Sequence, residues 1–229
     1  MKALVLEEYN RFACKQVPDP RPGPGEVLIA VKACGICGSD VHGMDGSTGR
    51  RQPPIIMGHE AAGVIEEVGA GVEGWKPGQR VTFDSTIYCG TCWHCRRAEI
   101  NLCDNRRVLG VSCDEYRQDG AFAEYVAVPA RILYALPDGV DFPQATMVEA
   151  LSIAVHGVRR IPVELNDCAL VVGAGTIGLL AVQVLKAFGC NPVIAVDLDG
   201  GKLEWARRLG ADVVIKSGDQ DVVPEVRRY

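Results

Sequence analysis

Four closely spaced cysteines constrain the fold of this chain more than any other feature. Cys89, Cys92 and Cys95 are each separated by two residues, and Cys103 follows shortly after. Three cysteines this close cannot easily all form disulfides of acceptable geometry, whereas zinc prefers tetrahedral sulfur ligation in closed structural sites. The intervening residues are polar and charged, which disfavours four unrelated buried thiols. We therefore predict a structural zinc ion bound by these four cysteines, with His94 as an alternative ligand in place of one of them.

The composition excludes several other classes of protein. Of the 229 residues, 48% are hydrophobic and 23% are charged, as in average globular proteins. A net charge of −5 without a basic cluster gives no electrostatic footprint for nucleic acid. No apolar run approaches the ~20 residues of a membrane helix, and charge near the N-terminus interrupts any signal peptide. We expect a cytoplasmic protein without nucleic-acid or membrane partners, and in a reducing compartment clustered cysteines, among the ten present, are more often metal ligands or catalytic groups than disulfides.

The character of the sequence changes near residue 150. Residues 1–150 are rich in Gly and Pro, and short aliphatic runs at 26–31 and 63–68 predict strands. Residues 147–159 have helical spacing, and strand-like and helix-like runs alternate after them, which predicts βαβ units around a parallel sheet. The expected elements are strands at 169–172, 193–196 and 213–215, helices at 177–188 and 202–209, and a short helix after residue 221.

A second set of metal-ligand residues lies in two separate segments. Residues 37–42 read CGSDVH, and residues 58–63 read GHEAAG. A catalytic zinc keeps three protein ligands and one open position, and Cys37, His59 and a carboxylate would provide that set. Each segment alone is weak, because a lone histidine is more often structural and Cys34 with Cys37 could form a redox pair.

A glycine-rich loop opens the α/β region. Residues 173–178 read GAGTIG, follow a predicted strand and precede a predicted helix, as a dinucleotide fingerprint requires. Gly173 allows the tight turn, Gly175 the approach of pyrophosphate and Gly178 close helix–strand packing, and the helix N-terminus holds the diphosphate. Asp197 ends the next strand and would accept from a ribose 2′-hydroxyl, which favours NAD over NADP, and Asp199 would add to the repulsion of a 2′-phosphate. A glycine turn without a ligand is the alternative.

Together these motifs resemble the alcohol dehydrogenase family, the zinc-dependent branch of the medium-chain dehydrogenase/reductase superfamily. GHEAAG with Gly69 and Val72 beyond it matches the signature of the zinc-containing members, and WKPGQRV at 75–81 matches a family turn and strand. The four-cysteine loop has the family's structural-zinc spacing. The resemblance implies a GroES-like catalytic domain over residues 1–150 and the N-terminal half of a Rossmann domain over residues 151–229. It also implies two zinc ions, one catalytic and one structural, and NAD.

The resemblance assigns roles to individual residues. Cys37 and His59 correspond to catalytic zinc ligands, and Glu60 lies beside the metal and can coordinate it. Ser39 corresponds to the hydroxyl that takes the substrate proton, and His42 to the group that passes it towards solvent. The residues expected to contact the nucleotide are Gly173, Gly175, Thr176, Ile177, Gly178, Asp197 and Lys202.

The remaining zinc-ligand position distinguishes branches of the family. Ordinary alcohol dehydrogenases have a cysteine there, whereas this chain has Glu149, as in sorbitol, other polyol and galactitol-phosphate dehydrogenases. Ala150 departs from the proline that usually follows, which leaves open whether Glu149 binds zinc directly or holds a zinc-bound water. A carboxylate at a helix N-terminus, favoured by the helix dipole, is the structural alternative.

The implied reaction is the reversible oxidation of a polyol or secondary alcohol to a ketone or aldehyde, with hydride transfer to NAD. A threonine or simple alcohol dehydrogenase is the alternative enzyme. The chain ends after the third strand of the dinucleotide fold, so we expect C-terminal truncation, and a non-catalytic zinc- and nucleotide-binding fragment is an alternative of another class. The expected partner is a small-molecule alcohol, and the full-length enzyme is expected to be a homo-dimer or homo-tetramer.

Overall fold

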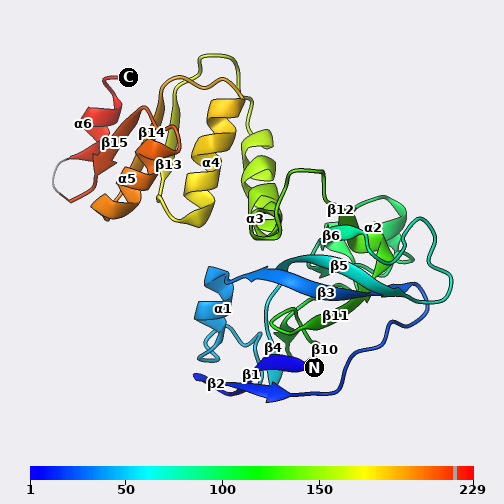
Figure 1. The fold of residues 1–229 in the computed structure, drawn as a ribbon. Helices are drawn as coiled ribbons and strands as arrows, with labels where there is room; N and C mark the ends of the chain where they lie inside the picture. Colours follow the sequence, from blue (N-terminus) through cyan, green and yellow to red (C-terminus); the bar gives the residue numbers. More distant parts are fainter. Residues whose placement is uncertain (219–220) are drawn as a thin grey trace. The chain divides into compact units, whose positions relative to one another are not determined.

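A computed structural model describes residues 1–218 and 221–229, and the chain forms two compact units, Met1–Glu149 and Ala150–Tyr229 (Figure 1). The sheets of the first unit contain antiparallel strand pairs, whereas the sheet of the second unit is parallel. The expected fold class, a β-rich domain followed by an α/β domain, is confirmed. Within the described ranges, no helix combines the length and apolar character needed to cross a membrane.

A five-stranded antiparallel sheet organises the first unit. Its two long central strands contain the runs predicted at 26–31 and 63–68, and their alternating side chains supply Val27, Ile29 and Ile65 to the core. The strand order is β11–β3–β5–β6–β12, with β3 (Glu26–Gly35), β5 (Glu60–Val68), β6 (Arg80–Phe83), β11 (Tyr125–Pro129) and β12 (Leu133–Ala135).

Smaller elements surround this sheet and carry much of the candidate chemistry. Helix α1 (Gly38–Gly43) has a glycine at each end, which lowers its intrinsic helix propensity and explains why the sequence pattern did not predict it. The other elements are a sheet of β2 (Arg11–Gln16), β1 (Lys2–Glu8) and β4 (Ile55–Ile56), the pair β7 (Thr86–Ile87) and β8 (Arg107–Val108), the pair β9 (Val111–Ser112) and β10 (Arg117–Gln118), helix α2 (Trp93–Arg96), and 3₁₀ turns at Ile100–Leu102 and Ala130–Ile132.

A three-stranded parallel sheet forms the centre of the second unit. Its order is β13–β14–β15, with β13 (Ala169–Val172), β14 (Val193–Asp197) and β15 (Val213–Lys216). The central strand β14 is buried over Val193–Val196, as expected for a parallel strand covered on both faces. Helices α4 (Thr176–Ala187), α5 (Gly200–Arg208) and α6 (Val222–Val226) follow the three strands in turn. The predicted strands and helices of this region are confirmed, with ends that shift by one or two residues.

Helix α3 (Phe142–Arg159) begins earlier than the helical spacing at 147–159 predicts. The side chain of Asp141 accepts from the backbone N–H of Gln144 at 2.7 Å, and the Gln144 side chain accepts from the N–H of Asp141 at 3.1 Å. This reciprocal pair is a capping box, and Pro143 is tolerated because it lies in the first turn. The cap, rather than the apolar pattern, therefore sets the start of the helix.

Candidate metal centres and nucleotide-binding loop

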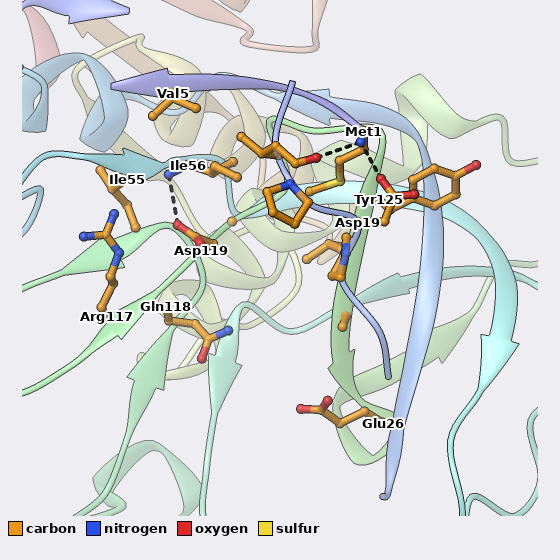
Figure 2. A pocket seen from close by; sticks show the side chains of 16 residues that line it. Met1, Val5, Asp19, Glu26, Ile55, Ile56, Arg117, Gln118, Asp119 and Tyr125 are labelled. Carbon is orange, nitrogen blue, oxygen red and sulfur yellow. Dashed lines mark hydrogen bonds and ion pairs between the residues drawn. The ribbon is translucent and has the colours of Figure 1, made fainter. Parts of the chain in front are cut away.

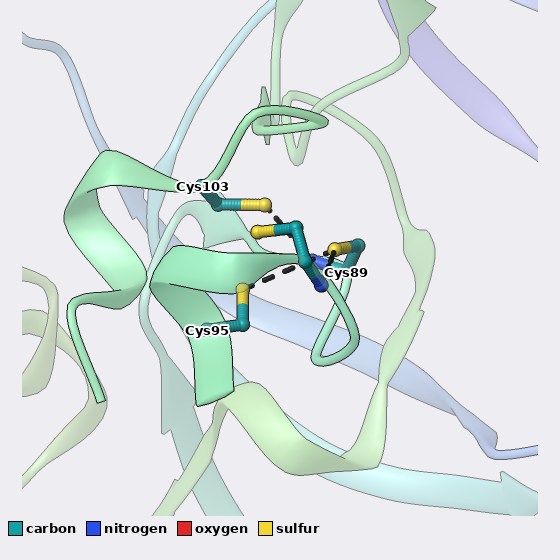
Figure 3. A group of neighbouring side chains, drawn as sticks. Cys89, Cys95 and Cys103 are labelled. Carbon is teal, nitrogen blue, oxygen red and sulfur yellow. Dashed lines mark hydrogen bonds between the residues drawn. The ribbon is translucent and has the colours of Figure 1, made fainter. Parts of the chain in front are cut away.

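The four-cysteine loop gathers its sulfur atoms into one group. The sulfurs of Cys89, Cys92, Cys95 and Cys103 all lie within 4.8 Å of one another (Figure 3). Cys92 is the N-cap of α2, so Cys95 lies one helical turn further on, and Cys103 follows the 3₁₀ turn at Ile100–Leu102. A closed set of four sulfurs fits the tetrahedral ligation of a structural zinc ion.

Local hydrogen bonds and the neighbouring sulfurs give these thiols different pKa values. The N–H groups of Thr91 and Cys92 lie 3.4 Å and 3.3 Å from Cys89 Sγ. Donation from Thr91, followed by Cys92, lowers the pKa of Cys89 to about 5. Burial and the neighbouring cysteines raise the pKa of Cys95 to about 12. Cys89 therefore loses its proton readily and Cys95 holds its proton, and a divalent cation bound by both sulfurs would favour the thiolate forms.

His94 lies in the same loop but is engaged elsewhere. Its Nδ1 is 3.0 Å from Glu99 Oε2, and its ring meets the exposed Trp93 edge to face at 4.8 Å between centroids. Arg97 also bonds Glu99 at 3.2 Å and lies over the Trp93 ring. The geometry therefore gives no support to His94 as an alternative ligand.

The sheet register brings the second set of ligands together. Gly35 at the end of β3 pairs with Glu60 at the start of β5, so the segment after β3 lies beside the segment before β5. Cys37 follows in the first segment as the N-cap of α1, and His59 immediately precedes β5. One ligand atom from each of Cys37, His59 and Glu60 lies within 4.8 Å of the other two. These residues are distant in the sequence and meet because the two strands pair.

A turn at Gly58 places His59 in this group. Gly58 has φ +92°, a left-handed conformation that favours glycine, and a Cβ there would lie 2.5 Å from the ring of Phe122. His59 and Glu60 are both buried. The GHE motif therefore combines a steric requirement at its first position with two ligand-type side chains.

Asp40 connects the two candidate ligands Cys37 and His59. Its Oδ2 accepts the backbone N–H of Cys37 at 3.1 Å, and its Oδ1 lies 3.4 Å from His59 Nδ1. The other ring nitrogen, Nε2, lies 3.4 Å from Ser39 Oγ. Burial lowers the pKa of His59, but the Asp40 carboxylate, together with Glu149 and Glu60, outweighs burial and raises this pKa overall. Sequence reasoning gave Asp40 no role, although its place three residues after an N-cap is a capping-box signal.

Glu149 and His42 lie outside the group of three. Glu149 is half-buried, and its charge acts on His59 and Glu60, while burial raises its own pKa. Because α3 begins at Phe142, the alternative of Glu149 as a helix N-terminal carboxylate is wrong: it lies well inside the helix. His42 is exposed on α1. The structure thus groups Glu60, rather than Glu149, with Cys37 and His59.

The glycine-rich loop has the geometry that its sequence predicts. Gly173 adopts φ +98°, Gly175 is the N-cap of α4, and Thr176 begins the helix. A Cβ at Gly178 would lie 1.8 Å from the carbonyl oxygen of Gly173, so only glycine fits there. The loop and the first turn of α4 therefore pack as closely as in dinucleotide-binding folds.

A carboxylate at the end of β14 accepts a hydrogen bond from the backbone of this loop. Asp197 Oδ2 accepts the N–H of Ala174 at 2.7 Å, and its Oδ1 accepts the N–H of Asp199 at 2.9 Å, which lowers the pKa of Asp197. Asp199, which was expected to add to the repulsion of a 2′-phosphate, also caps α5 by accepting from Gly201 at 2.7 Å and Lys202 at 3.3 Å. The exposed Lys202 lies near enough for its charge to act on Asp197.

Two alanine substitutions separate packing from nucleotide binding in this loop. Gly178→Ala is expected to cost about 3 kcal/mol of stability, because its Cβ would overlap backbone. Gly175→Ala meets no protein atom within 4 Å and has φ −75°, so stability should change by less than about 1 kcal/mol while nucleotide affinity falls. Thermal unfolding and NAD titration of both variants measure this. Equal stability losses would contradict the assignment of the two glycines.

A cavity of about 600 Å³ lies elsewhere in the first unit (Figure 2). Val5, Ile55 and Ile56 supply part of its apolar lining, and the amino group of Met1 pairs with Asp19 at its side. No candidate metal ligand lines this cavity. It is therefore separate from both cysteine-containing sites.

Comparison with known proteins assigns both units to one family. The pattern of the alcohol dehydrogenase GroES-like domain matches residues 23–138, and that of the zinc-binding dehydrogenase domain matches residues 176–229. The chain is 42% identical over 214 residues to L-threonine 3-dehydrogenase of Pyrococcus horikoshii, covering 92% of this chain and 60% of that protein. It is 38% identical over 226 residues to sorbitol dehydrogenase of Halalkalibacterium halodurans, covering 97% and 64%.

A solved structure shares the fold of the chain. The zinc-binding dehydrogenase of Sinorhizobium meliloti 1021, crystallised bound to NADP, superimposes with a TM-score of 0.89 at 36% identity, covering 97% of this chain and 63% of that one. The chain thus spans about three fifths of the length of these relatives. With both domain patterns matched in order, the chain belongs to the zinc-binding alcohol dehydrogenase family.

Proposed function

We propose that this protein is an oxidoreductase that uses zinc and NAD to convert a polyol or secondary alcohol reversibly to a ketone or aldehyde. The observation that carries the proposal is the group of Cys37, His59 and Glu60, whose ligand atoms lie within 4.8 Å of one another. A thiolate, an imidazole and a carboxylate are ligand types of catalytic zinc sites, which keep a further position for substrate. Glu149 is near enough to act on this group electrostatically.

The residues around this group suit alcohol oxidation. A zinc ion held there supplies Lewis-acid polarisation of the substrate oxygen. Ser39, whose hydroxyl lies 3.4 Å from His59 Nε2, is positioned to take the substrate proton, and the exposed His42 on the same helix can exchange protons with solvent. A relay of this kind lets the substrate proton reach solvent while bulk water is excluded from the place where hydride is transferred.

The second unit supplies the nucleotide site in this proposal. The N-terminus of α4 would hold the diphosphate, and Asp197 would accept from the adenosine ribose hydroxyls. Each Asp197 oxygen accepts one backbone N–H and retains a lone pair for ribose. Because a carboxylate repels a 2′-phosphate, we expect NAD to bind more tightly than NADP, which parallel titrations measure. Tighter binding of NADP would contradict this role of Asp197.

A substrate panel tests the proposed reaction. Sorbitol, galactitol phosphate, L-threonine and ethanol would each be incubated with the zinc-loaded protein and NAD, and the reduced cofactor followed by its absorbance. L-threonine is a specific second candidate because of the 42% identity to a threonine dehydrogenase. Turnover with sorbitol or galactitol phosphate supports the proposal, whereas turnover with L-threonine alone favours the second candidate. Zinc and NAD binding without turnover on any of the four would favour a non-catalytic zinc- and nucleotide-binding protein.

The setting of the enzyme is also a proposal. All ten cysteines are free thiols, which suits a reducing compartment such as the cytoplasm. We expect small molecules as partners, and a homo-dimer or homo-tetramer as the assembly of the full-length enzyme. Light scattering during size-exclusion chromatography measures the assembly directly, and a monomer at working concentration would contradict it.

A further inference from the structure

A buried arginine, Arg51, lies close to a carboxylate that contacts the candidate catalytic metal site. Arg51 is 5% exposed, and its Nη2 lies 3.6 Å from Asp40 Oδ1. The same carboxylate oxygen lies 3.4 Å from Nδ1 of His59. A guanidinium and an imidazole therefore share one oxygen of a carboxylate that is itself 3% exposed.

Backbone contacts hold both charged side chains in place. Asp40 Oδ2 accepts the N–H of Cys37 at 3.1 Å, and Arg51 Nη1 donates to the carbonyl of Arg50 at 3.1 Å. The Arg51 stem lies against the C-terminal end of α1, where a Cβ at Gly43 would be 2.6 Å from Arg51 Cγ. The guanidinium is thus fixed relative to the helix that carries Asp40.

Among the residues that the structure describes, the buried side-chain nitrogen and oxygen atoms without a hydrogen-bond partner belong to this cluster. Within the described part of the chain they are Asp40 Oδ1, Arg51 Nε and His59 Nδ1. Buried polar atoms normally have partners, and exceptions call for a functional explanation. One of the three atoms belongs to His59 itself and Asp40 Oδ1 lies 3.4 Å from it, so the cluster adjoins the group of Cys37, His59 and Glu60.

The charges explain why an arginine is needed at this position. A buried carboxylate is costly unless a positive charge compensates it, and a guanidinium is permanently charged. Without Arg51, a metal ion held by His59 would be the nearest strong positive charge to Asp40. The carboxylate would then lack the permanent charge that compensates it on the side away from His59, and its contact with Nδ1 of His59 would weaken. With Arg51 present, the carboxylate is held at the back of the imidazole ring.

We propose that Arg51 is a positioning residue of the catalytic metal site. It holds Asp40 so that Asp40 fixes Nδ1 of His59 and leaves Nε2 for the metal. Partners of this kind orient metal-binding histidines, and their loss typically weakens metal binding by roughly 10- to 100-fold. The proposal rests on the proposed function, because it requires a metal ion at Cys37, His59 and Glu60.

Cobalt substitution tests this role without relying on turnover. The protein would be prepared with zinc at the four-cysteine site and cobalt at the other, as the wild type and as Arg51→Met, Arg51→Lys and Arg50→Met. Arg50 is exposed and adjacent, so Arg50→Met is a matched control for the loss of one arginine. We expect Arg51→Met to alter the cobalt d–d spectrum and to release cobalt to a chelator roughly tenfold faster. Arg51→Lys, which keeps the charge, should retain the wild-type spectrum, as should Arg50→Met.

The outcomes separate this proposal from the proposed function. If the wild type takes up no second metal ion, the proposed catalytic site itself is wrong. If the wild type binds cobalt but Arg51→Met has an unchanged spectrum and release rate, the role of Arg51 is wrong. Circular dichroism and the zinc content of the four-cysteine site report whether each variant folds. If Arg51→Met does not fold, Arg51→Gln, which also removes the charge, takes its place, and a folded glutamine variant with the wild-type cobalt spectrum and release rate would overturn the proposal.

Discussion

Replacing Cys95 by serine is expected to remove one zinc ion per chain and to lower the melting temperature by roughly 10 °C. The sulfur of Cys95 lies within 4.8 Å of the other three sulfurs, so a closed tetrahedral site cannot form without it. The loop at 89–103 contains only α2 and one 3₁₀ turn as regular structure, so we expect its order to depend on the metal. Loss of a metal is one of the causes of large single-substitution effects, and a loss of about 4 kcal/mol gives a shift of this size for a chain of this length.

Elemental analysis and thermal unfolding measure this effect against a matched control. Cys14 is an exposed cysteine in the same unit, so Cys14→Ser removes a thiol without touching a candidate site. The control should keep both zinc ions and the wild-type melting temperature. An unchanged zinc count in Cys95→Ser would contradict the four-cysteine site.

Replacing Cys37 by serine is expected to remove the other zinc ion and to reduce NAD-dependent turnover about 1,000-fold. Cys37 is the only sulfur ligand in the group with His59 and Glu60. The loss corresponds to about 4 kcal/mol of transition-state stabilisation, within the several kcal/mol that a Lewis-acid metal supplies. The fold should survive, because serine keeps the backbone N–H that donates to Asp40 and can cap α1 with its own hydroxyl.

Cys34 offers the matched control, because it is the other cysteine of the same C-x-x-C segment. It packs against the core of the five-stranded sheet, and burial raises its pKa to about 12, so it is an unreactive thiol. Cys34→Ser should therefore keep both zinc ions and most of the turnover. Equal loss of activity in both variants would instead favour a redox pair of Cys34 and Cys37.

Local patterns predicted the parts of this structure that depend on short stretches of sequence. The four-cysteine group follows from spacing within one loop, and the glycine-rich loop follows from its place between a strand and a helix. In both cases the residues that meet are neighbours in the chain, so spacing alone limits their geometry. The early start of α3 is also set by neighbouring residues, the capping box of Asp141 and Gln144. The spacing of apolar residues does not reveal a capping box, so the prediction missed this start.

Local sequence patterns could not predict the contacts that depend on the tertiary fold. The choice between Glu60 and Glu149 depends on the register of β3 with β5 and on the course of α3, neither of which spacing specifies. Arg51 carries no motif and reaches Asp40 because the loop that holds it returns beneath α1. From its neighbours in the sequence alone, an arginine close to two prolines is expected to be an ordinary surface residue.

The position of Asp197 complicates any attempt to engineer the cofactor preference of this protein. Exchanging such an acid for a neutral residue is an obvious way to admit a 2′-phosphate. Here the same carboxylate also fastens the glycine-rich loop through Ala174 and the turn before α5 through Asp199. A variant at this position would lose two loop anchors together with the negative charge. Weak binding of both dinucleotides would then report a loosened loop, and only the ratio of the two affinities would report selectivity.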